Sequence, residues 1–399
     1  MPAPATSPSE HARHVTAAGA TSPGRRVLFS LVTVLVAVGL ALATLELLSW
    51  GFFRSRELLD QDLRVFCKPR SGGMPIATKR RFVQRWTTDE FDVTIRTNSL
   101  GLREDFELPA GGRVDVGFLG DSFTFGHGVN AGQRFSDVVR AGLRNAVVVS
   151  FGYADGFTTP HYYLYLKERP ALIPRVAVVA LFLGNDLSGD MMESELIPGE
   201  DGDLVRVEAR YREPDALGRL VTRDRNPVNR MLRRTWTGCY LLYLDRQLGL
   251  NLEPLRPDRA IPLYGWVRPD LDLGKLDDTA RDALRYVAKI RDLVRAHGGE
   301  TVMLLVPPQY YIAPRYHSPH ANDVVTVRVQ TDLPLVHAIE TWCSENELTC
   351  VDPISHLRRL EQARTRTYFY FDGHLTAAGH TAVAMALLPA VTRALAASR

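Results

Sequence analysis

Cysteine is scarce in this chain, and the common metal-binding and nucleotide-binding motifs are missing. The 399 residues include four cysteines, and none of them belongs to a C-x-x-C pair, so no structural zinc site is expected. There is also no H-E-x-x-H, EF-hand loop, Walker loop or G-x-G-x-x-G. We therefore expect neither a metal ion nor a cofactor. The four cysteines are Cys67, Cys239, Cys343 and Cys350.

The last two cysteines lie close together in the sequence. Cys343 and Cys350 flank the segment SENELT, between an expected helix and an expected strand. In an oxidising compartment these two residues could close a small loop as a disulfide. Two unpaired thiols fit the sequence equally well, so both interpretations stay open.

An excess of one sign of charge is also missing. The chain has 48 Lys and Arg against 45 Asp and Glu, which gives a net charge of +3. Charge this balanced, spread along the chain, provides no basic surface for a phosphate backbone. Nucleic acid is therefore not expected as a partner.

What the sequence does have is one long apolar run near its beginning. Residues 1–26 are rich in Ala, Pro, Ser, Thr and Gly without apolar periodicity, which predicts a disordered tail. The 19 residues from 27 to 45 carry no charge and would span about 28 Å as a helix. We predict a transmembrane anchor over residues 27–50. A cleaved signal segment is the alternative, because Ala41-Leu42-Ala43 fits a small-residue cleavage site.

The residues around this run favour an anchor but say little about its orientation. The apolar character continues past the cleavage site, and Trp50 suits a membrane interface. Arginines both precede and follow the span, so the positive-inside bias is almost nil. N-terminal spans of this kind are commonly export signals. We therefore expect a single-pass membrane protein with its folded domain on the periplasmic or extracellular side. The arginines are Arg13, Arg25 and Arg26 before the span, and Arg54, Arg56 and Arg64 after it.

The rest of the chain reads as a short lead-in followed by alternating strands and helices. Residues 54–112 are polar, and period-two alternation in FDVTIRTNSLGLRE predicts a strand or hairpin. Residues 113–399 then form one domain in which near-continuously apolar strands alternate with amphipathic helices. This pattern predicts a three-layer α/β/α sandwich with a parallel sheet. The expected strands are 113–119, 146–151, 176–183, 301–306 and 349–352, and the expected helices are 133–144, 159–169, 276–297, 331–346 and 376–396.

A long insertion, residues 187–275, interrupts this alternation. Insertions of this length are usually functional or disordered. Within it, VNRMLRRTWTGCYLLYLDRQL predicts an amphipathic helix with arginines beside aromatic residues. Packing on the core with solvated arginines is the simpler interpretation, and a lid or membrane-contact role is the alternative.

Residues of the types needed for nucleophilic catalysis follow the ends of the expected strands. The apolar run DVGFL stops at Gly120-Asp121-Ser122, which places a hydroxyl at the edge of the sheet. A serine nucleophile needs a base and oxyanion donors. Asp372 and His374 in YFDGHL supply a candidate acid and base, while Gly152 and Asn185, at the ends of the next two strands, are candidate donors.

Three neighbouring residues have simpler explanations. Asp121 is expected to brace the turn rather than to react. His380, in the last helix, is the rival base and is more consistent with a structural role. His127 in FGHGV could line a cleft, but the simpler expectation is a solvated loop histidine.

Through these residues the chain resembles the SGNH (GDSL) hydrolases over roughly residues 113–397. Gly120-Asp121-Ser122 matches the nucleophile block of that family, Gly152 its glycine block, Gly184-Asn185-Asp186 its asparagine block, and Asp372 with His374 its acid and base block. The upstream TNSLGLR, residues 97–103, is typical of bacterial members. The resemblance implies a flavodoxin-like sandwich.

The resemblance also implies roles. Ser122 would attack an acyl carbon, His374 would take its proton, and Asp372 would orient the imidazole. The backbone amides of Ser122 and Gly152 and the side-chain amide of Asn185 would form the oxyanion hole. One departure is the Asp-x-His spacing, where the family usually has Asp-x-x-His. The shorter spacing occurs in relatives resembling alginate O-acetyltransferases, in which Trp follows the His; Leu375 follows it here.

Together these features predict a serine esterase acting on small acyl esters, acetyl esters foremost, on a small molecule or polysaccharide. An O-acyltransferase that modifies envelope or extracellular polysaccharide is one alternative. A catalytically silent carbohydrate-binding protein with the same fold is the other.

Overall fold

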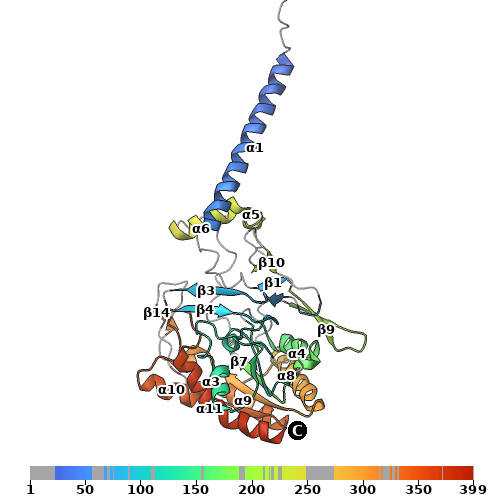
Figure 1. The fold of residues 1–399 in the computed structure, drawn as a ribbon, viewed down its shortest axis with the longest axis vertical. Helices are drawn as coiled ribbons and strands as arrows, with labels where there is room; N and C mark the ends of the chain where they lie inside the picture. Colours follow the sequence, from blue (N-terminus) through green and yellow to red (C-terminus); the bar gives the residue numbers. More distant parts are fainter. Residues whose placement is uncertain are drawn as a thin grey trace, which may run out of the picture.

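The structure is a computed structural model of the 399-residue chain. The parts of the chain that it describes are residues 23–55, 67–69, 72–74, 76–88, 90–108, 113–153, 157–187, 194–209, 212–214, 216, 220–222, 227–248, 274–313, 316–317, 324–325, 329, 332–370 and 372–398. Within them, a long N-terminal helix stands away from an α/β body (Figure 1).

The N-terminal helix α1 extends over Pro23–Ser55. The most apolar 18-residue window of its segment Gly24–Phe52 has a mean hydropathy of 2.5 and is 0% buried by the rest of the protein. The helix therefore begins inside the tail predicted over residues 1–26, of which residues 1–22 lie outside the described part. An exposed apolar helix of this length is compatible with a membrane anchor or a signal segment. The last helix, α11 (Ala377–Ala397), is also long and apolar, but it packs on the body.

The body is built on a five-stranded parallel sheet in the order β15-β12-β7-β5-β6. If these five strands are numbered 1 to 5 in chain order and read from the β6 edge, their order is 2-1-3-4-5, the flavodoxin-like arrangement. The predicted fold class is confirmed, and the strands lie where the apolar runs placed them. They are β5 (Val116–Leu119), β6 (Val148–Ser150), β7 (Val176–Phe182), β12 (Glu300–Val306) and β15 (Thr349–Val351).

Helices cover both faces of this sheet, which explains why its strands are apolar on both sides. Helix α4 packs against α8, and α3 packs against α11. In α8 the buried residues recur at helical spacing, and Asp277 caps its first turn by accepting a hydrogen bond from Ala280 N. Helix α10 was not foreseen. The helices are α3 (Phe135–Gly142), α4 (Thr159–Lys167), α8 (Asp278–Ala296), α9 (Pro334–Glu345) and α10 (Ile354–Gln362), with 3-10 turns at Pro170–Leu172 and Gln309–Tyr311.

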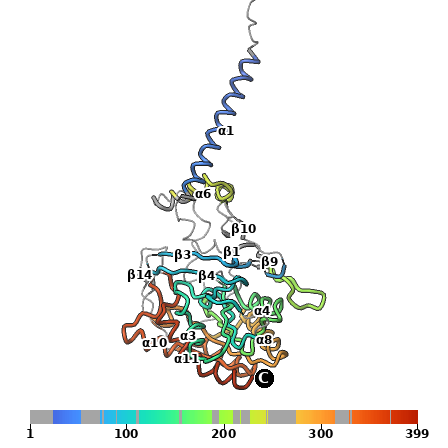
Figure 2. Tube along the Cα trace, viewed as in Figure 1, coloured from blue at the N-terminus to red at the C-terminus, as the bar shows by residue number. Residues whose placement is uncertain are grey.

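The lead-in and the insertion form small antiparallel pairs outside the main sheet. The hairpin of β3 (Val83–Thr87) and β4 (Asp92–Arg96) lies between the foot of α1 and the main sheet along the long axis of the molecule (Figures 1 and 2). The other pairs are β1 (Cys67–Pro69) with β2 (Ile76–Thr78), β8 (Ser194–Pro198) with β9 (Leu204–Ala209), β10 (Arg212–Pro214) with β11 (Leu220–Thr222), and β13 (Tyr316–His317) with β14 (Val324–Val325).

The helix predicted in the insertion is broken into two. Helix α5 (Pro227–Leu232) and helix α6 (Trp236–Leu248) are separated by a turn. Thr235 explains the break, because its Oγ1 accepts a hydrogen bond from Gly238 N and thereby starts a new helix. Residues 249–273 of the insertion lie outside the described part.

The two late cysteines are free thiols in the structure. Cys343 is fully buried in α9 and contacts Met303 Sδ. A hydrogen bond with Cys343, followed by burial, raises the pKa of the Cys350 thiol. The two thiols are therefore in contact without being bonded covalently.

Candidate active site

Ser122 lies at the point where the strand order of the sheet reverses. Strand β5 ends at Leu119, and Ser122 begins the one-turn helix α2 (Ser122–Phe125). Asp121 precedes it and accepts a hydrogen bond from Phe123 N at 3.0 Å. Because β6 and β7 flank β5, the chain leaves β5 at the crevice where open α/β sheets place their ligands. Asp121 thus braces the turn that presents the Ser122 hydroxyl.

His374 joins Ser122 to Asp372. Its Nε2 atom lies 2.8 Å from Ser122 Oγ, and its Nδ1 atom lies 2.7 Å from Asp372 Oδ1. A carboxylate can only accept, so Nδ1 carries the proton and Nε2 is left to accept from the serine hydroxyl. The structure therefore brings together the serine, histidine and aspartate that the sequence proposed, in the geometry of a nucleophile, its base and an orienting acid.

The glycine between Asp372 and His374 allows their side chains to meet despite the short Asp-x-His spacing. Gly373 has φ +78°, in the left-handed region. This conformation turns the chain so tightly that His374 N also donates to Asp372 Oδ1, at 3.3 Å. The two side chains consequently meet on one side of the loop despite the missing residue.

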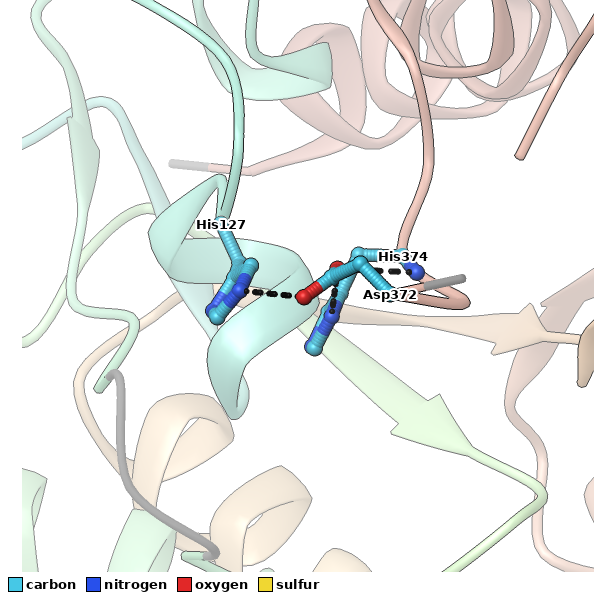
Figure 3. Close-up of side chains that lie close together, drawn as sticks. All are labelled: His127, Asp372 and His374. Atoms are coloured by element: carbon cyan, nitrogen blue, oxygen red, sulfur yellow. Dashed lines mark hydrogen bonds and ion pairs between the residues drawn. The ribbon is translucent and has the colours of Figure 1, made fainter. Parts of the chain in front are cut away.

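A second histidine completes this cluster and corrects the sequence-based expectation for it. His127 is 7% exposed, not a solvated loop residue. Its Nε2 lies 2.9 Å from Asp372 Oδ2, and its ring stacks on that of His374 at 3.9 Å and 11° (Figure 3). The ring of Trp86, in the β3–β4 hairpin, packs edge to face against the ring of His127, with 4.4 Å between the ring centroids. Asp372 therefore bonds to one imidazole through each carboxylate oxygen.

The charge states follow from this packing. Burial raises the pKa of Asp372, but the positive charges and hydrogen bonds of His374 and His127 outweigh it and hold that pKa well below its usual range. Burial, and then the charge of His374, lower the pKa of His127 to about 4. At neutral pH Asp372 is thus an anion and His127 is neutral, so His127 Nε2–H donates to the carboxylate. Its Nδ1 atom is buried and has no hydrogen-bond partner among the described residues.

Glu90, in the turn of the β3–β4 hairpin, fixes the loop that carries the aspartate. Its carboxylate accepts hydrogen bonds from Tyr370 N and from Asp372 N, the latter at 2.8 Å. The contact with Asp372 spans 282 residues of sequence. The hairpin is therefore part of the site, which sequence reasoning missed because no local pattern marks so distant a contact.

The two candidate oxyanion donors lie beside the serine turn. A Cβ atom on Gly152 would stand 2.3 Å from Phe125 N, so only glycine allows this approach to α2. Among the described residues, the Gly152 amide makes a single long contact, of 3.4 Å to Ser150 Oγ. Asn185 Nδ2 lies 3.3 Å from Asp121 Oδ2. Both candidates thus border the nucleophile turn from the strands on either side of β5.

A buried pair of carboxyl groups lies behind this turn. Burial raises the pKa of Asp121 to about 6. Burial and then the charge of Asp121 raise the pKa of Asp186 well above its usual range. Asp186 accepts from Phe182 N at 2.8 Å, and Tyr162 Oη lies 3.1 Å from its other oxygen. Burial and the neighbouring carboxylate therefore favour the protonated form of Asp186.

The upstream segment TNSLGLR holds the loop that follows Ser122. The Arg103 guanidinium donates to the carbonyls of Phe125, Gly126 and Val129. Arg134, also buried, pairs with Glu104 at 2.9 Å. Because this loop carries His127, the segment positions the second histidine as well as the serine.

His380 lies away from the serine. It is fully buried in α11, and its Nδ1 accepts a hydrogen bond from Phe135 N at 3.2 Å. Burial lowers the pKa of His380 to about 3. Its position is that of a neutral histidine packed between α11 and α3.

The two stacked histidines and Asp372 also form a compact set of metal-ligand types, with donor atoms within 4.8 Å of one another. The lone pair of an imidazole nitrogen lies in the plane of its ring. Two rings stacked at 11° therefore hold their lone pairs in nearly parallel planes, which do not meet at one ion. The geometry fits shared hydrogen bonding to the carboxylate better than metal binding.

No protein-family model matches the sequence, and no curated protein matches it either. Solved structures of GDSL proteins are similar to it at low identity. A lipolytic GDSL-family protein from Veillonella parvula shares 11% identity, with 70% of this chain and 99% of that chain covered and a TM-score of 0.34.

Two further solved structures are similar at the same level. A GDSL-like lipase from Bacteroides thetaiotaomicron shares 12% identity, over 72% of this chain and 93% of that one, with a TM-score of 0.33. An acetyl xylan esterase shares 11% identity, over 70% of this chain and 100% of that one, with a TM-score of 0.34. At TM-scores this low, function has to be inferred from the site itself.

Proposed function

We propose that the protein is a serine ester hydrolase in which Ser122 is the nucleophile. The observation that carries this proposal is the continuous hydrogen-bond chain from Ser122 Oγ through both nitrogens of His374 to Asp372, with links of 2.8 and 2.7 Å. A serine hydroxyl is unreactive at its ordinary pKa unless a base is within this reach.

In the proposed mechanism His374 Nε2 takes the hydroxyl proton as Oγ attacks the ester carbonyl carbon. Asp372 stabilises the imidazolium that forms and keeps Nδ1 protonated. His374 then gives the proton to the leaving alkoxide, which departs as an alcohol and leaves an acyl-serine. A water molecule, deprotonated by the same nitrogen, releases the acid and restores the serine.

The negative charge that develops on the carbonyl oxygen needs donors beside Ser122. We assign this role to the backbone amides of Ser122 and Gly152 and to the side-chain amide of Asn185. The close approach of Gly152 to α2 and the contact of Asn185 with Asp121 support the assignment. Removal of one such donor typically costs about 10²- to 10³-fold in rate.

His127 acts as a positioning residue for the acid. Neutral at working pH, it donates to the Asp372 oxygen that His374 does not use. This second hydrogen bond fixes the rotation of the carboxylate, which the loop through Gly373 alone would leave less constrained.

For the substrate, we propose a small acyl ester, acetyl foremost, on a carbohydrate, processed at a membrane surface. Helix α1 would anchor the chain, with the body on the periplasmic or extracellular side. The β3–β4 hairpin, which bonds to Asp372 through Glu90, lies on the side of the body that faces α1 (Figures 1 and 2). The site would thus sit near the bilayer, where envelope polysaccharide is assembled.

The test is turnover of p-nitrophenyl acetate by the full chain in detergent micelles. Ser122→Ala should lower kcat by about 10⁴-fold or more, whereas Ser355→Ala, at an exposed position on α10, should not. Turnover that survives Ser122→Ala would refute the serine mechanism.

Adding an oligosaccharide acceptor separates the remaining possibilities. If the acetyl group appears on the acceptor, the protein is an O-acyltransferase. A folded wild-type chain without any turnover would instead favour a carbohydrate-binding protein.

A further inference from the structure

The helices of the insertion are attached to the C-terminal end of α1. The Glu46 carboxylate accepts hydrogen bonds from Trp236 N at 2.7 Å and Thr237 N at 2.9 Å. These are the first two backbone amides of α6, which have no acceptor within that helix, so Glu46 satisfies them and its charge complements the helix dipole. Six residues later on α1, the ring of Phe52 meets the ring of Tyr240 edge to face, with 4.7 Å between the ring centroids. The only acidic residue of the apolar helix is thus used to hold α6.

The position of Glu46 fixes the depth of α6 relative to a bilayer. The uncharged run of α1 ends at Leu45, one residue before Glu46. At 1.5 Å per residue this run is about as long as the hydrocarbon core is thick. When α1 spans a membrane, Glu46 therefore lies at the edge of the hydrocarbon, and the first turn of α6 lies in the headgroup layer.

The surface of α5 and α6 suits that layer. Met231 is 64% exposed and Leu241 is 46% exposed. Val228 is also exposed and lies three residues before Met231, on the same face of α5. Arg234, in the turn that follows α5, is exposed, and Arg230 on α5 is half-buried. In Figure 1 both helices lie across the foot of α1 rather than along it.

We propose that α5 and α6 form an interfacial helix pair (Pro227–Leu248) that lies in the headgroup layer of an anionic bilayer. Val228, Met231 and Leu241 contact the acyl boundary, and the two arginines, Arg230 and Arg234, bind lipid phosphates. This inference rests on the proposed anchoring by α1.

Photo-crosslinking of the full chain in liposomes tests the proposal. A benzophenone side chain is introduced at one of three exposed positions: Leu35 in α1, Met231 in α5, or Val205 on the β9 strand of the body. Lipid adducts are expected at Leu35 and Met231 and not at Val205. Adducts at Leu35 without adducts at Met231 would overturn the interfacial pair and leave the anchor intact. A lack of adducts at Leu35 would overturn the anchor and this inference with it.

A second experiment varies the charge of the lipid. Adducts at Met231 should be stronger in liposomes that contain phosphatidylglycerol than in phosphatidylcholine alone. Arg230→Gln and Arg234→Gln should each lower the yield of lipid adducts at Met231 in the anionic liposomes about fivefold, while Arg206→Gln on β9 should not. Turnover of p-nitrophenyl acetate should stay unchanged in all three variants, which verifies folding. Equal adducts in both lipids, or protein–protein adducts at Met231 that indicate a second copy, would overturn the proposal.

Discussion

The Nδ1 atom of His374 and the Oδ1 atom of Asp372 lie 2.7 Å apart although a single residue separates them in the chain. That residue, Gly373, has φ +78°. Among the described residues, a Cβ atom added to it would meet nothing closer than Gln309 Oε1 at 3.8 Å. The space beside Gly373 is therefore open, and only its backbone conformation demands a glycine.

Replacing this glycine tests whether the backbone conformation sets the geometry of the acid and base. Gly373→Ala should destabilise the loop by about 1–2 kcal/mol, because a Cβ atom disfavours the left-handed region. We expect kcat for p-nitrophenyl acetate to fall about tenfold, which corresponds to ~1.4 kcal/mol. Gly373→Asn is the matched control, since asparagine adopts this conformation more readily, and it should retain most of the activity. Equal loss in both variants would contradict this account.

His127 gives the second prediction. His127→Phe keeps the ring stack on His374 but removes the hydrogen bond to Asp372, and kcat should fall about 10- to 100-fold, the range for a lost bond to a charged group. The Asp372 carboxylate, which no longer accepts a hydrogen bond from residue 127, then stabilises the His374 imidazolium more strongly. The acidic limb of the kcat/KM profile should therefore move to higher pH.

His127→Gln is the control for that experiment, because its amide retains a donor near the Nε2 position. Its pH profile should resemble that of the wild type. If both variants lose activity without any shift of the acidic limb, His127 has only a packing role.

Stability in acid gives the third prediction. His127 and His380 have native pKa values of about 4 and about 3, below the ordinary value of 6.5. Between pH 6.5 and about 4 the unfolded chain binds these protons and the native protein does not, so both histidines make stability fall as the pH falls. Asp121, whose pKa is raised to about 6, acts in the opposite sense. Only a comparison of variants therefore isolates one histidine.

His380→Asn provides that comparison, because its side-chain oxygen can accept from Phe135 N as Nδ1 does now. The free energy of unfolding of this variant should depend less steeply on pH between 6.5 and 4, by about 1.4 kcal/mol per pH unit. Urea titrations at several pH values measure the slope. Parallel curves for variant and wild type would mean that His380 is already protonated in the native protein.

The sheet was predictable because its physical cause is local. Strands covered by helices on both faces are continuously apolar, and β7 and β12 read that way in the sequence. Ser122 and Asn185 could be placed near one another because the ends of parallel strands meet at one edge. Helix α10 was missed because its short segment, at 354–362, has few apolar residues.

The rest of the site depends on contacts that no local pattern records. His127 bonds to Asp372 across 245 residues, and its burial depends on Trp86 from the hairpin. In sequence it appears as a polar residue between two glycines, which is typical of a solvated turn. The role of Glu90 likewise exists only once the hairpin is folded over the loop that carries Asp372.

Arg103 gives the last prediction, because one guanidinium supports the whole loop after Ser122. It is 4% exposed and donates to three carbonyls, those of Phe125, Gly126 and Val129. A lysine carries the same charge but cannot reach three acceptors from one planar fork. Arg103→Lys should therefore leave buried carbonyls unpaired and cost about 2–3 kcal/mol of unfolding free energy.

The control for Arg103 lies in the same ionic network. Arg140 binds Glu104 at 3.1 Å from a partly exposed position, so a lysine there keeps its ion pair and its hydration. Arg140→Lys should cost less than about 1 kcal/mol. Urea denaturation measures both variants, and kcat should fall in Arg103→Lys alone, because only Arg103 bonds to the loop that carries His127. Equal destabilisation by the two substitutions would show that the charge of Arg103, rather than its fork of donors, holds the nucleophile loop.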